Sequence, residues 1–97
     1  RDQSIAAVWF YKSALKGHAG AQLALGSIHI RGIGVYQDLS KAYKWLTIAA
    51  ESGIGDISQQ ASTLRKDAAL LMTKDEIDEA VSAAKDFKPI QAGLVRD

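Results

Sequence analysis

The chain has 97 residues, of which 47% are hydrophobic and 24% are charged, and 12 basic against 11 acidic side chains give a formal net charge of +1. This balance argues against a surface for nucleic acid or for an anionic membrane, and no apolar run approaches the roughly 18 residues that a transmembrane helix needs. The absence of cysteine excludes disulfides and thiolate metal sites. It leaves the compartment open between a cytoplasm and a bacterial periplasm or cell envelope.

Two helices separated by a glycine are predicted at the start of the chain. Apolar residues over 4–16 fall at spacings of three, four and seven, which is helical rather than strand periodicity. Gly17 can close this helix in the left-handed conformation, and a second apolar stripe runs over 19–31. Gly26 lies inside the second helix, where it costs about 1 kcal/mol relative to alanine. It either marks a close approach between two helices or is simply tolerated.

The next two predicted helices repeat the pattern of the first two. Asp38 is a suitable N-cap for a helix over 39–52, and a helix over 56–71 corresponds to the second one. Four pairs of identical residues lie 36 positions apart: Ala6 and Ala42, Trp9 and Trp45, Ala14 and Ala50, and Gly17 and Gly53. A fixed interval of about 20 to 50 residues is typical of a solenoid, in which equal supersecondary units stack on their neighbours.

A fifth helix closes the predicted array. Thr73 and Glu76 form a capping box at its start, and the helix runs over 74–88. Residues 89–97 carry no recognisable pattern and are expected to form a flexible tail. Five helices without any alternating strand pattern predict an all-α fold, a superhelical solenoid of helical hairpins over 1–88 that ends in an amphipathic helix.

A set of short motifs runs through the first half of the chain. They are Gly17-His18-Ala19, Ala21-Gln22, Leu25-Gly26, the loop Gly32-Ile33-Gly34-Val35, Asp38, Lys41-Ala42, Trp45 and Ala49-Ala50-Glu51. Together they strongly resemble the Sel-like repeat (SLR) family, a relative of the tetratricopeptide repeats. The resemblance covers roughly 4–61 and then fades, because Ser62 stands where the repeat has glycine and no second loop of this kind follows. We therefore expect the C-terminal end of a longer array.

The resemblance implies a right-handed superhelix whose inner helices line a concave groove that receives a partner protein or peptide. The inner helices are then those over 19–31 and 56–71. Carried over position by position, the groove side presents Leu23, Ser27, Ile30 and Arg31 and, 36 residues later, Gln59, Thr63, Lys66 and Asp67. This surface is mixed in character with a basic edge, and no cofactor is implied.

Residues that could carry chemistry fit structural roles in this sequence. The two histidines lack the cysteine or acidic neighbours of a metal site, and Ser27 and His29 point in different directions on one helix, so they form no nucleophile and base pair. The acidic residues over 75–79 suit the positive end of a helix dipole better than a carboxylate site. The recurrence of Trp9 and Trp45 favours core packing between hairpins over base stacking. We therefore expect no enzyme.

The repeat favours a non-enzymatic module that binds a protein or peptide on its concave face as an adaptor, an assembly factor or a regulator. One alternative is a structural spacer or docking stalk for an enzymatic domain outside this segment. Another is an inhibitor or immunity-type protein that neutralises a secreted enzyme. Self-association through the N-terminal hairpin face is a further expectation, because exposed apolar surfaces associate.

Overall fold

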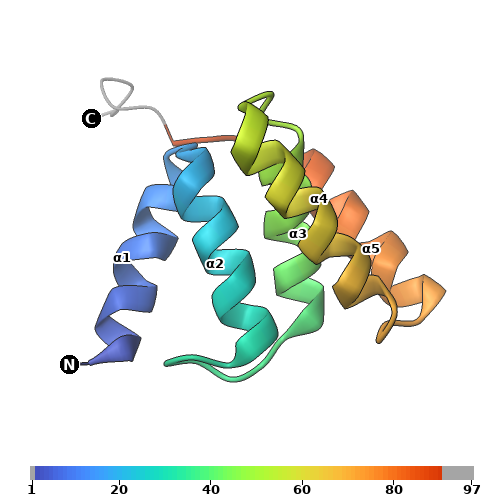
Figure 1. The fold of residues 1–97 in the computed structure, drawn as a ribbon, viewed down its shortest axis with the longest axis horizontal. Coiled ribbons are helices and arrows are strands. Elements are labelled where there is room, and N and C mark those ends of the chain that lie inside the picture. Colours follow the sequence, from blue (N-terminus) through green and yellow to red (C-terminus); the bar gives the residue numbers. More distant parts are fainter. Residues whose placement is uncertain (1, 91–97) are drawn as a thin grey trace.

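The computed structural model describes residues 2–90, which form five α-helices and no strand (Figure 1). The helices are α1 (Gln3–Leu15), α2 (Ala19–Arg31), α3 (Leu39–Ala50), α4 (Gly55–Ala69) and α5 (Lys74–Asp86). The predicted all-α fold is confirmed. The third, fourth and fifth helices end two residues earlier than their sequence patterns suggest, because the chain leaves the helical conformation there in a turn or an extended segment.

Side-chain caps begin three of the five helices. The Asp38 carboxylate accepts a hydrogen bond from the Lys41 N–H at 3.0 Å at the start of α3, and Asp2 caps α1 in a similar way. At α5, the side chains of Thr73 and Glu76 accept from each other's backbone N–H groups at 3.1 and 2.8 Å. Each cap satisfies N–H groups that have no partner within the helix. The predicted N-cap and capping box are confirmed.

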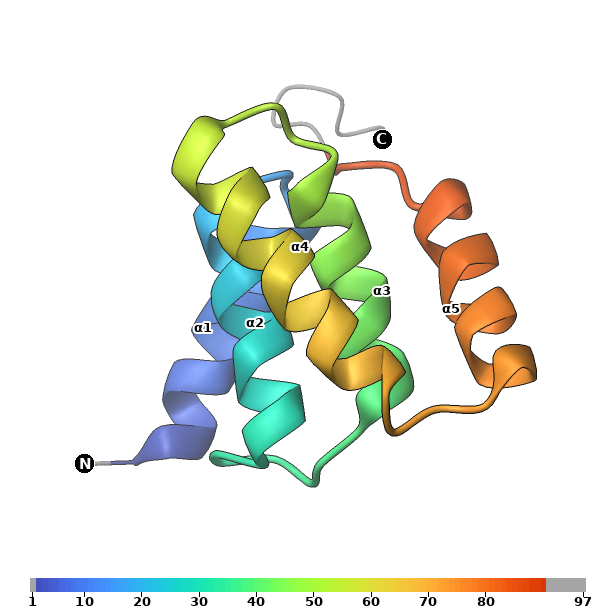
Figure 2. The same cartoon turned by 45° about the vertical axis from the view of Figure 1, so that its right-hand side comes forward.

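The helices form two layers. Helix α2 packs against α1, α3 and α4, and α3 packs against α2, α4 and α5. Tyr11 of α1 and Phe87 of α5 both meet Trp45 of α3 edge-on, with their ring centroids 6.3 and 5.3 Å from the Trp45 centroid. Helices α1, α3 and α5 therefore make one layer and α2 and α4 the other, with α1 and α5 at opposite ends of the array (Figures 1 and 2).

Two clusters of buried apolar side chains hold the layers together. One joins α3 to α4 and consists of Ala42, Leu46, Ala49 and Ala61. The other joins α1, α2 and α3 and consists of Ala14, Leu25 and Trp45. Alanine predominates in the first cluster and also contributes to the second, so the helices can approach closely. The packing of each cluster therefore depends on its few large side chains.

Gly26 permits the close approach of α2 to α3. A Cβ atom at this position would lie 2.6 Å from two carbon atoms of the Leu46 side chain, which is closer than real carbon contacts. Leu46 is fully buried and has little room to move aside. The interpretation of Gly26 as a point of close approach is confirmed, and it accounts for a glycine in the middle of a helix.

The hairpin of α1 and α2 and the hairpin of α3 and α4 each contain a hydrogen bond at the equivalent position. In the first hairpin, Gln22 Nε2 donates to the carbonyl oxygen of Ala14 at 3.1 Å. In the second, the Ser58 hydroxyl donates to the carbonyl oxygen of Ala50. Both donors and both acceptors lie 36 positions apart, and each bond joins the end of the first helix of a hairpin to its second helix. The interval in the sequence therefore marks a structural repeat.

The two tryptophans differ in burial although they occupy equivalent positions. Trp45 is 2% exposed, whereas Trp9 is 65% exposed. Trp45 lies between α1 and α5, but within residues 2–90 helix α1 has a neighbour in its own layer on one side only. The expectation of core packing is thus confirmed for Trp45 and wrong for Trp9. The Lys12 ammonium lies 5.5 Å from the centroid of the Trp9 ring instead.

The chain after α5 returns to the turn between α1 and α2 (Figure 1). The Ile90 N–H donates to the carbonyl oxygen of Leu15 at 2.7 Å, and Pro89 lies beside Gly17, where an added Cβ would be 3.2 Å from the Pro89 Cβ. The first two residues of the expected flexible tail are therefore held against the end of α1. The remainder of that tail, 91–97, lies outside the described residues.

Candidate functional site

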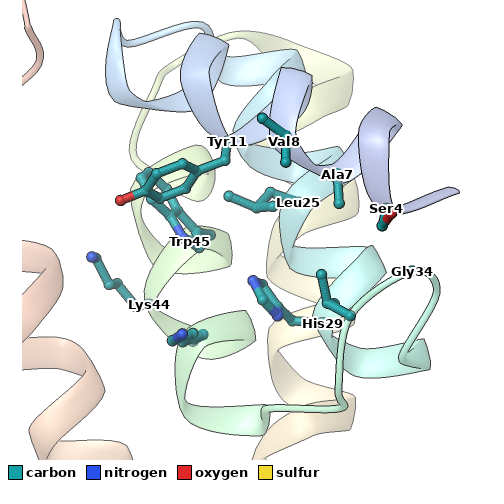
Figure 3. A pocket seen from close by; sticks show the side chains of 11 residues that line it. Ser4, Ala7, Val8, Tyr11, Leu25, His29, Gly34, Lys44 and Trp45 are labelled. Atoms are coloured by element: carbon teal, nitrogen blue, oxygen red, sulfur yellow. The ribbon is translucent and has the colours of Figure 1, made fainter. Parts of the chain in front are cut away.

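A groove runs between α1 and α3, with α2 as its floor (Figure 3). Its volume is about 420 Å³. Leu25 and His29 of α2 form the floor, Val8 of α1 lines one side, and Tyr11 of α1 meets Trp45 of α3 edge-on. The groove lies in the layer formed by α1, α3 and α5, and α4 lies on the far side of α2 (Figure 3).

Helical spacing brings the lining residues of each helix into one stripe. On α1 the stripe is Ser4, Val8 and Tyr11, at intervals of four and three residues, and on α2 it is Leu25 and His29, four residues apart. Residues three and four apart lie on the same face of a helix. The groove is therefore built from one face of each of three helices.

The loop between α2 and α3 closes one end of the groove. Gly34 has a φ of +77°, and a Cβ atom there would lie 2.5 Å from the carbonyl carbon of Gln3, so only glycine allows the loop to approach the start of α1. The Asp38 N–H donates to the carbonyl oxygen of His29 at 2.9 Å, which fixes the far end of the loop. Val35 then lines the groove.

Tyr11 and Trp45 form an aromatic wall of the groove. The ring of Tyr11, which is partly exposed, meets the buried ring of Trp45 at an interplanar angle of 90°. The Lys44 ammonium lies 4.7 Å from the centroid of the Trp45 ring, a distance typical of a cation–π contact. Aromatic side chains of this kind contribute large contact areas at binding surfaces with little loss of conformational entropy.

His29 is a buried polar group on the groove floor. Its side chain is only 9% exposed, and its Nδ1 atom has no hydrogen-bond partner within residues 2–90. Burial lowers the pKa of His29, and the nearby Lys41 ammonium lowers it further against the opposing effects of Asp38 and of the Tyr36 backbone. The imidazole is therefore neutral at pH 7 and has one nitrogen that can donate and one that can accept a hydrogen bond.

Two lysines give the groove a positive charge. Lys41 and Lys44 both line it, and no aspartate or glutamate does. In the described part of the chain, neither ammonium has a carboxylate within ion-pair distance, whereas Lys74 and Asp78 of α5 form an ion pair at 3.0 Å. The groove thus combines an apolar wall with unpaired positive charge.

Residues 2–90 offer no arrangement typical of a metal centre, because no three His, Asp or Glu side chains within that range gather as ligands. Across the same range, every helix is too short or too polar to pass through a lipid bilayer.

The family model of the Sel1 repeat matches residues 1–18 and 19–54. This chain belongs to the Sel1 repeat family. Chitin synthase regulatory factor 3 of Schizosaccharomyces pombe is 46% identical to it over 48 residues, which are 50% of this chain and 5% of that protein. This chain therefore spans a small part of the length of the relative. No solved structure is significantly similar to it.

The Sel1 repeat is a non-enzymatic protein-interaction repeat, so the expectation of an interaction module is confirmed in this general form. The repeat over 19–54 contains α2, the loop and α3, and the match over 1–18 contains α1. The groove therefore lies between one Sel1 repeat and the one before it. The relative is fungal, so the expectation of a bacterial source has no support.

The residues proposed from the Sel1 resemblance lie on α2 and α4, outside the groove. Leu23 and Ile30 pack against the buried cluster between α3 and α4, and Ser27 is half-buried. Gln59 and Thr63 share a shallow hollow on α4, and the Thr63 hydroxyl donates to the Gln59 carbonyl oxygen at 3.1 Å. The three remaining members of the set are exposed, Arg31 on α2 and both Lys66 and Asp67 on α4. The use of this α2/α4 face by a partner stays a prediction.

Sequence reasoning missed the groove residues. It assigned a structural role to His29, because this residue stands in no recognisable catalytic or metal motif, and it assigned no binding role to the lysines of α3. The available indication was the spacing of Lys41, Lys44 and Trp45, which places all three on one face of α3. The contribution of Val8 and Tyr11 could not be seen in this way, since it depends on how α1 packs beside α3.

Proposed function

We propose that this chain is a non-enzymatic interaction module that holds a segment of a partner protein in the groove between α1 and α3. The observation that carries the proposal is the juxtaposition of an apolar, aromatic wall with unpaired lysines around a hollow of about 420 Å³. The module acts as an adaptor, an assembly factor or a regulator. The name of the fungal relative, a regulatory factor, agrees with the last of these roles.

The composition of the groove favours it over the α2/α4 face. Binding energy at protein interfaces concentrates in buried aromatic and arginine anchors that fill pockets. The groove presents the exposed ring of Tyr11 and the exposed side chain of Val8, whereas the exposed members of the α2/α4 set are polar or charged and the hollow on α4 has no aromatic residue in its lining. Leu23 and Ile30, the apolar members, already contribute to the core.

A matched pair of variants tests this assignment. Val8→Glu places a charged side chain in the apolar wall of the groove, and Thr63→Glu adds the same side chain to the α2/α4 face; both positions are exposed on helices. A partner captured by the parent chain and identified by mass spectrometry is then titrated against each variant. We expect at least a tenfold loss of affinity for Val8→Glu and none for Thr63→Glu, with equal helicity by circular dichroism.

The opposite pattern would assign binding to the α2/α4 face, and equal affinity of all three chains would exclude both surfaces. A chain that captures no partner would favour the structural spacer. A partner that proves to be a secreted enzyme, inhibited on binding, would identify the inhibitor or immunity-type role.

The exposed face of α1 supports self-association as a secondary property. Ile5, Val8 and Trp9 are each more than half exposed along this helix. Large apolar side chains gathered on one surface favour contact with another molecule. Sedimentation of the parent chain and of Trp9→Glu tests this, since a dimer should dissociate in the variant, and a monomeric parent would exclude it.

A further inference from the structure

We infer that the groove recognises an extended partner segment in which acidic side chains alternate with apolar ones. This inference rests on the proposed function and specifies the chemistry of the partner. It follows from three features of the groove: its unpaired lysines, the orphaned nitrogen of His29, and the placement of its apolar wall.

Within residues 2–90, neither lysine of the groove forms an ion pair in the free protein. Lys41 lies in the first turn of α3, where the positive end of the helix dipole disfavours a cation. The Asp38 carboxylate caps α3 through the Lys41 N–H and does not pair with the Lys41 ammonium, and the Lys44 ammonium lies over the ring of Trp45. Because the whole chain has a net charge of only +1, this concentration of positive charge is local. A carboxylate from a partner would interact favourably with both ammonium groups and with the start of the helix.

His29 supplies an unused hydrogen-bonding group below the lysines. Its side chain is nine-tenths buried, its Nδ1 has no partner among the described residues, and its ring points into the groove between α2 and α3 (Figure 3). A buried polar atom without a partner is unfavourable, and a polar group of a bound segment would remove that cost. The backbone amide and carbonyl groups of an extended segment can supply this partner.

The geometry favours alternation along the bound segment. Side chains two residues apart in an extended chain point to the same side and are separated by about 6.6 Å. Lys41 and Lys44 are three residues apart on α3, a rise of about 4.5 Å, and their flexible side chains can bridge the difference. Two acidic side chains of one segment can therefore reach both lysines while the residues between them contact Val8 and Tyr11.

Three probe peptides test this inference directly. Each is an acetylated and amidated pentapeptide in which leucine alternates with glutamate, with glutamine or with lysine. Titration of the ¹⁵N-labelled chain should show at least tenfold tighter binding of the glutamate peptide than of the glutamine peptide, and no binding of the lysine peptide. The amide shifts should map to α1, α3 and the loop between α2 and α3, and not to α4.

A charge-matched pair of double variants provides the control. Lys41→Gln with Lys44→Gln should abolish the difference between the glutamate and glutamine peptides. Lys66→Gln with Lys88→Gln removes the same charge from exposed positions outside the groove and should preserve that difference. Because both double variants lower the net charge by the same amount, a general effect of charge would reduce binding equally in the two.

The outcomes of these experiments distinguish the acidic specificity of the ligand from the location of the binding site. Equal binding of the glutamate and glutamine peptides in the groove would overturn the acidic specificity and leave the groove as the binding site. Shifts confined to α4 would overturn both the specificity and the site. No binding of any peptide would overturn the acidic segment as the ligand, and the variants Val8→Glu and Thr63→Glu would still decide independently whether a partner uses the groove.

Discussion

Helices α1 and α3 occupy equivalent places in consecutive repeats but have opposite environments. Trp9 is 65% exposed and Trp45 is 2% exposed, and the next residues differ in the same sense, since Phe10 is 39% exposed and Leu46 is fully buried. α3 has α1 and α5 beside it and α2 and α4 behind it, whereas α1 packs mainly on α2. In a solenoid, the repeat determines which face of a helix is apolar, and the neighbouring helices determine whether that face is buried.

The same comparison explains the character of the groove. Val8 of α1 is equivalent to Lys44 of α3, and Tyr11 is equivalent to Thr47, because each pair lies 36 positions apart. Thr47 is buried and accepts a hydrogen bond from Arg65, while Tyr11 is partly exposed and lines the groove. Helix α1 therefore contributes apolar side chains to the groove, and α3 contributes positive charge. Repeats of one family can thus build an asymmetric binding surface.

The largest expected effect concerns the two tryptophans. Trp45→Ala should lower the free energy of unfolding by about 3 to 5 kcal/mol, because it removes a buried aromatic side chain that joins three helices. Trp9→Ala should change it by no more than about 0.5 kcal/mol, as is usual at exposed positions. Urea denaturation followed by circular dichroism measures both. Similar losses in the two variants would contradict the difference in burial.

A smaller effect is expected for the hydrogen bond that the hairpins share. Gln22→Ala should cost about 1 to 2 kcal/mol, because Gln22 is buried and donates to Ala14. Ser58→Ala should cost about 1 kcal/mol, since Ser58 is half-buried. The same denaturation experiment compares them. If neither variant loses stability, the bond does not stabilise the repeat.

Substitutions of two glycines of α2 test how closely this helix packs against its neighbours. Gly26→Ala should cost about 1 kcal/mol in net terms, because the clash with Leu46 outweighs the better helix propensity of alanine. Gly20→Ala should be neutral or stabilising by up to about 1 kcal/mol, since its Cβ would lie 3.8 Å from Ile57 in ordinary contact. Equal effects of the two substitutions would show that α2 does not approach α3 closely at Gly26.

The smallest expected effect is the pH dependence due to His29. Burial lowers the pKa of His29 in the folded chain below the ordinary value of 6.5, so below that pH the unfolded chain binds more protons than the folded one. The free energy of unfolding should therefore fall as the pH decreases from about 6.5 toward the lowered pKa. His29→Gln should remove this dependence, because it replaces the titrating imidazole by a neutral amide. Urea denaturation at pH 7.5 and pH 5.5 measures the difference, and an unchanged pH dependence in the variant would contradict it.

The features that the sequence predicts well are local. The helices, the Asp38 cap and the capping box at Thr73 depend on residues within a few positions of one another, and these predictions are confirmed. The role of Gly26 could also be predicted, because a glycine beside an apolar stripe in a helix is typical of a close contact between two helices. The close approach of Leu46 to Gly26 confirms it. The fold class follows from the helical periodicity and from the Sel1 resemblance.

The features that the sequence does not predict depend on distant contacts. The exposure of Trp9 follows from the absence of a second neighbour beside α1 within the described residues, and the burial of Trp45 depends partly on Phe87, 42 positions later. The groove requires α1, α2 and α3 to be placed relative to one another. For this reason Lys41 and His29 become candidate binding residues only in the folded chain.

The most direct test of the central claim is a crosslinking measurement at two positions. The chain has no cysteine, so Tyr36→Cys and Thr63→Cys each introduce one site for a benzophenone maleimide label, on the loop that closes the groove and on the α2/α4 face respectively. Tyr36 is 95% exposed and follows Val35, so the label lies beside the groove without filling it. We predict that the captured partner crosslinks on illumination to the label at position 36 and not to the label at position 63. Crosslinking at position 63 alone would contradict the assignment of the groove as the binding site.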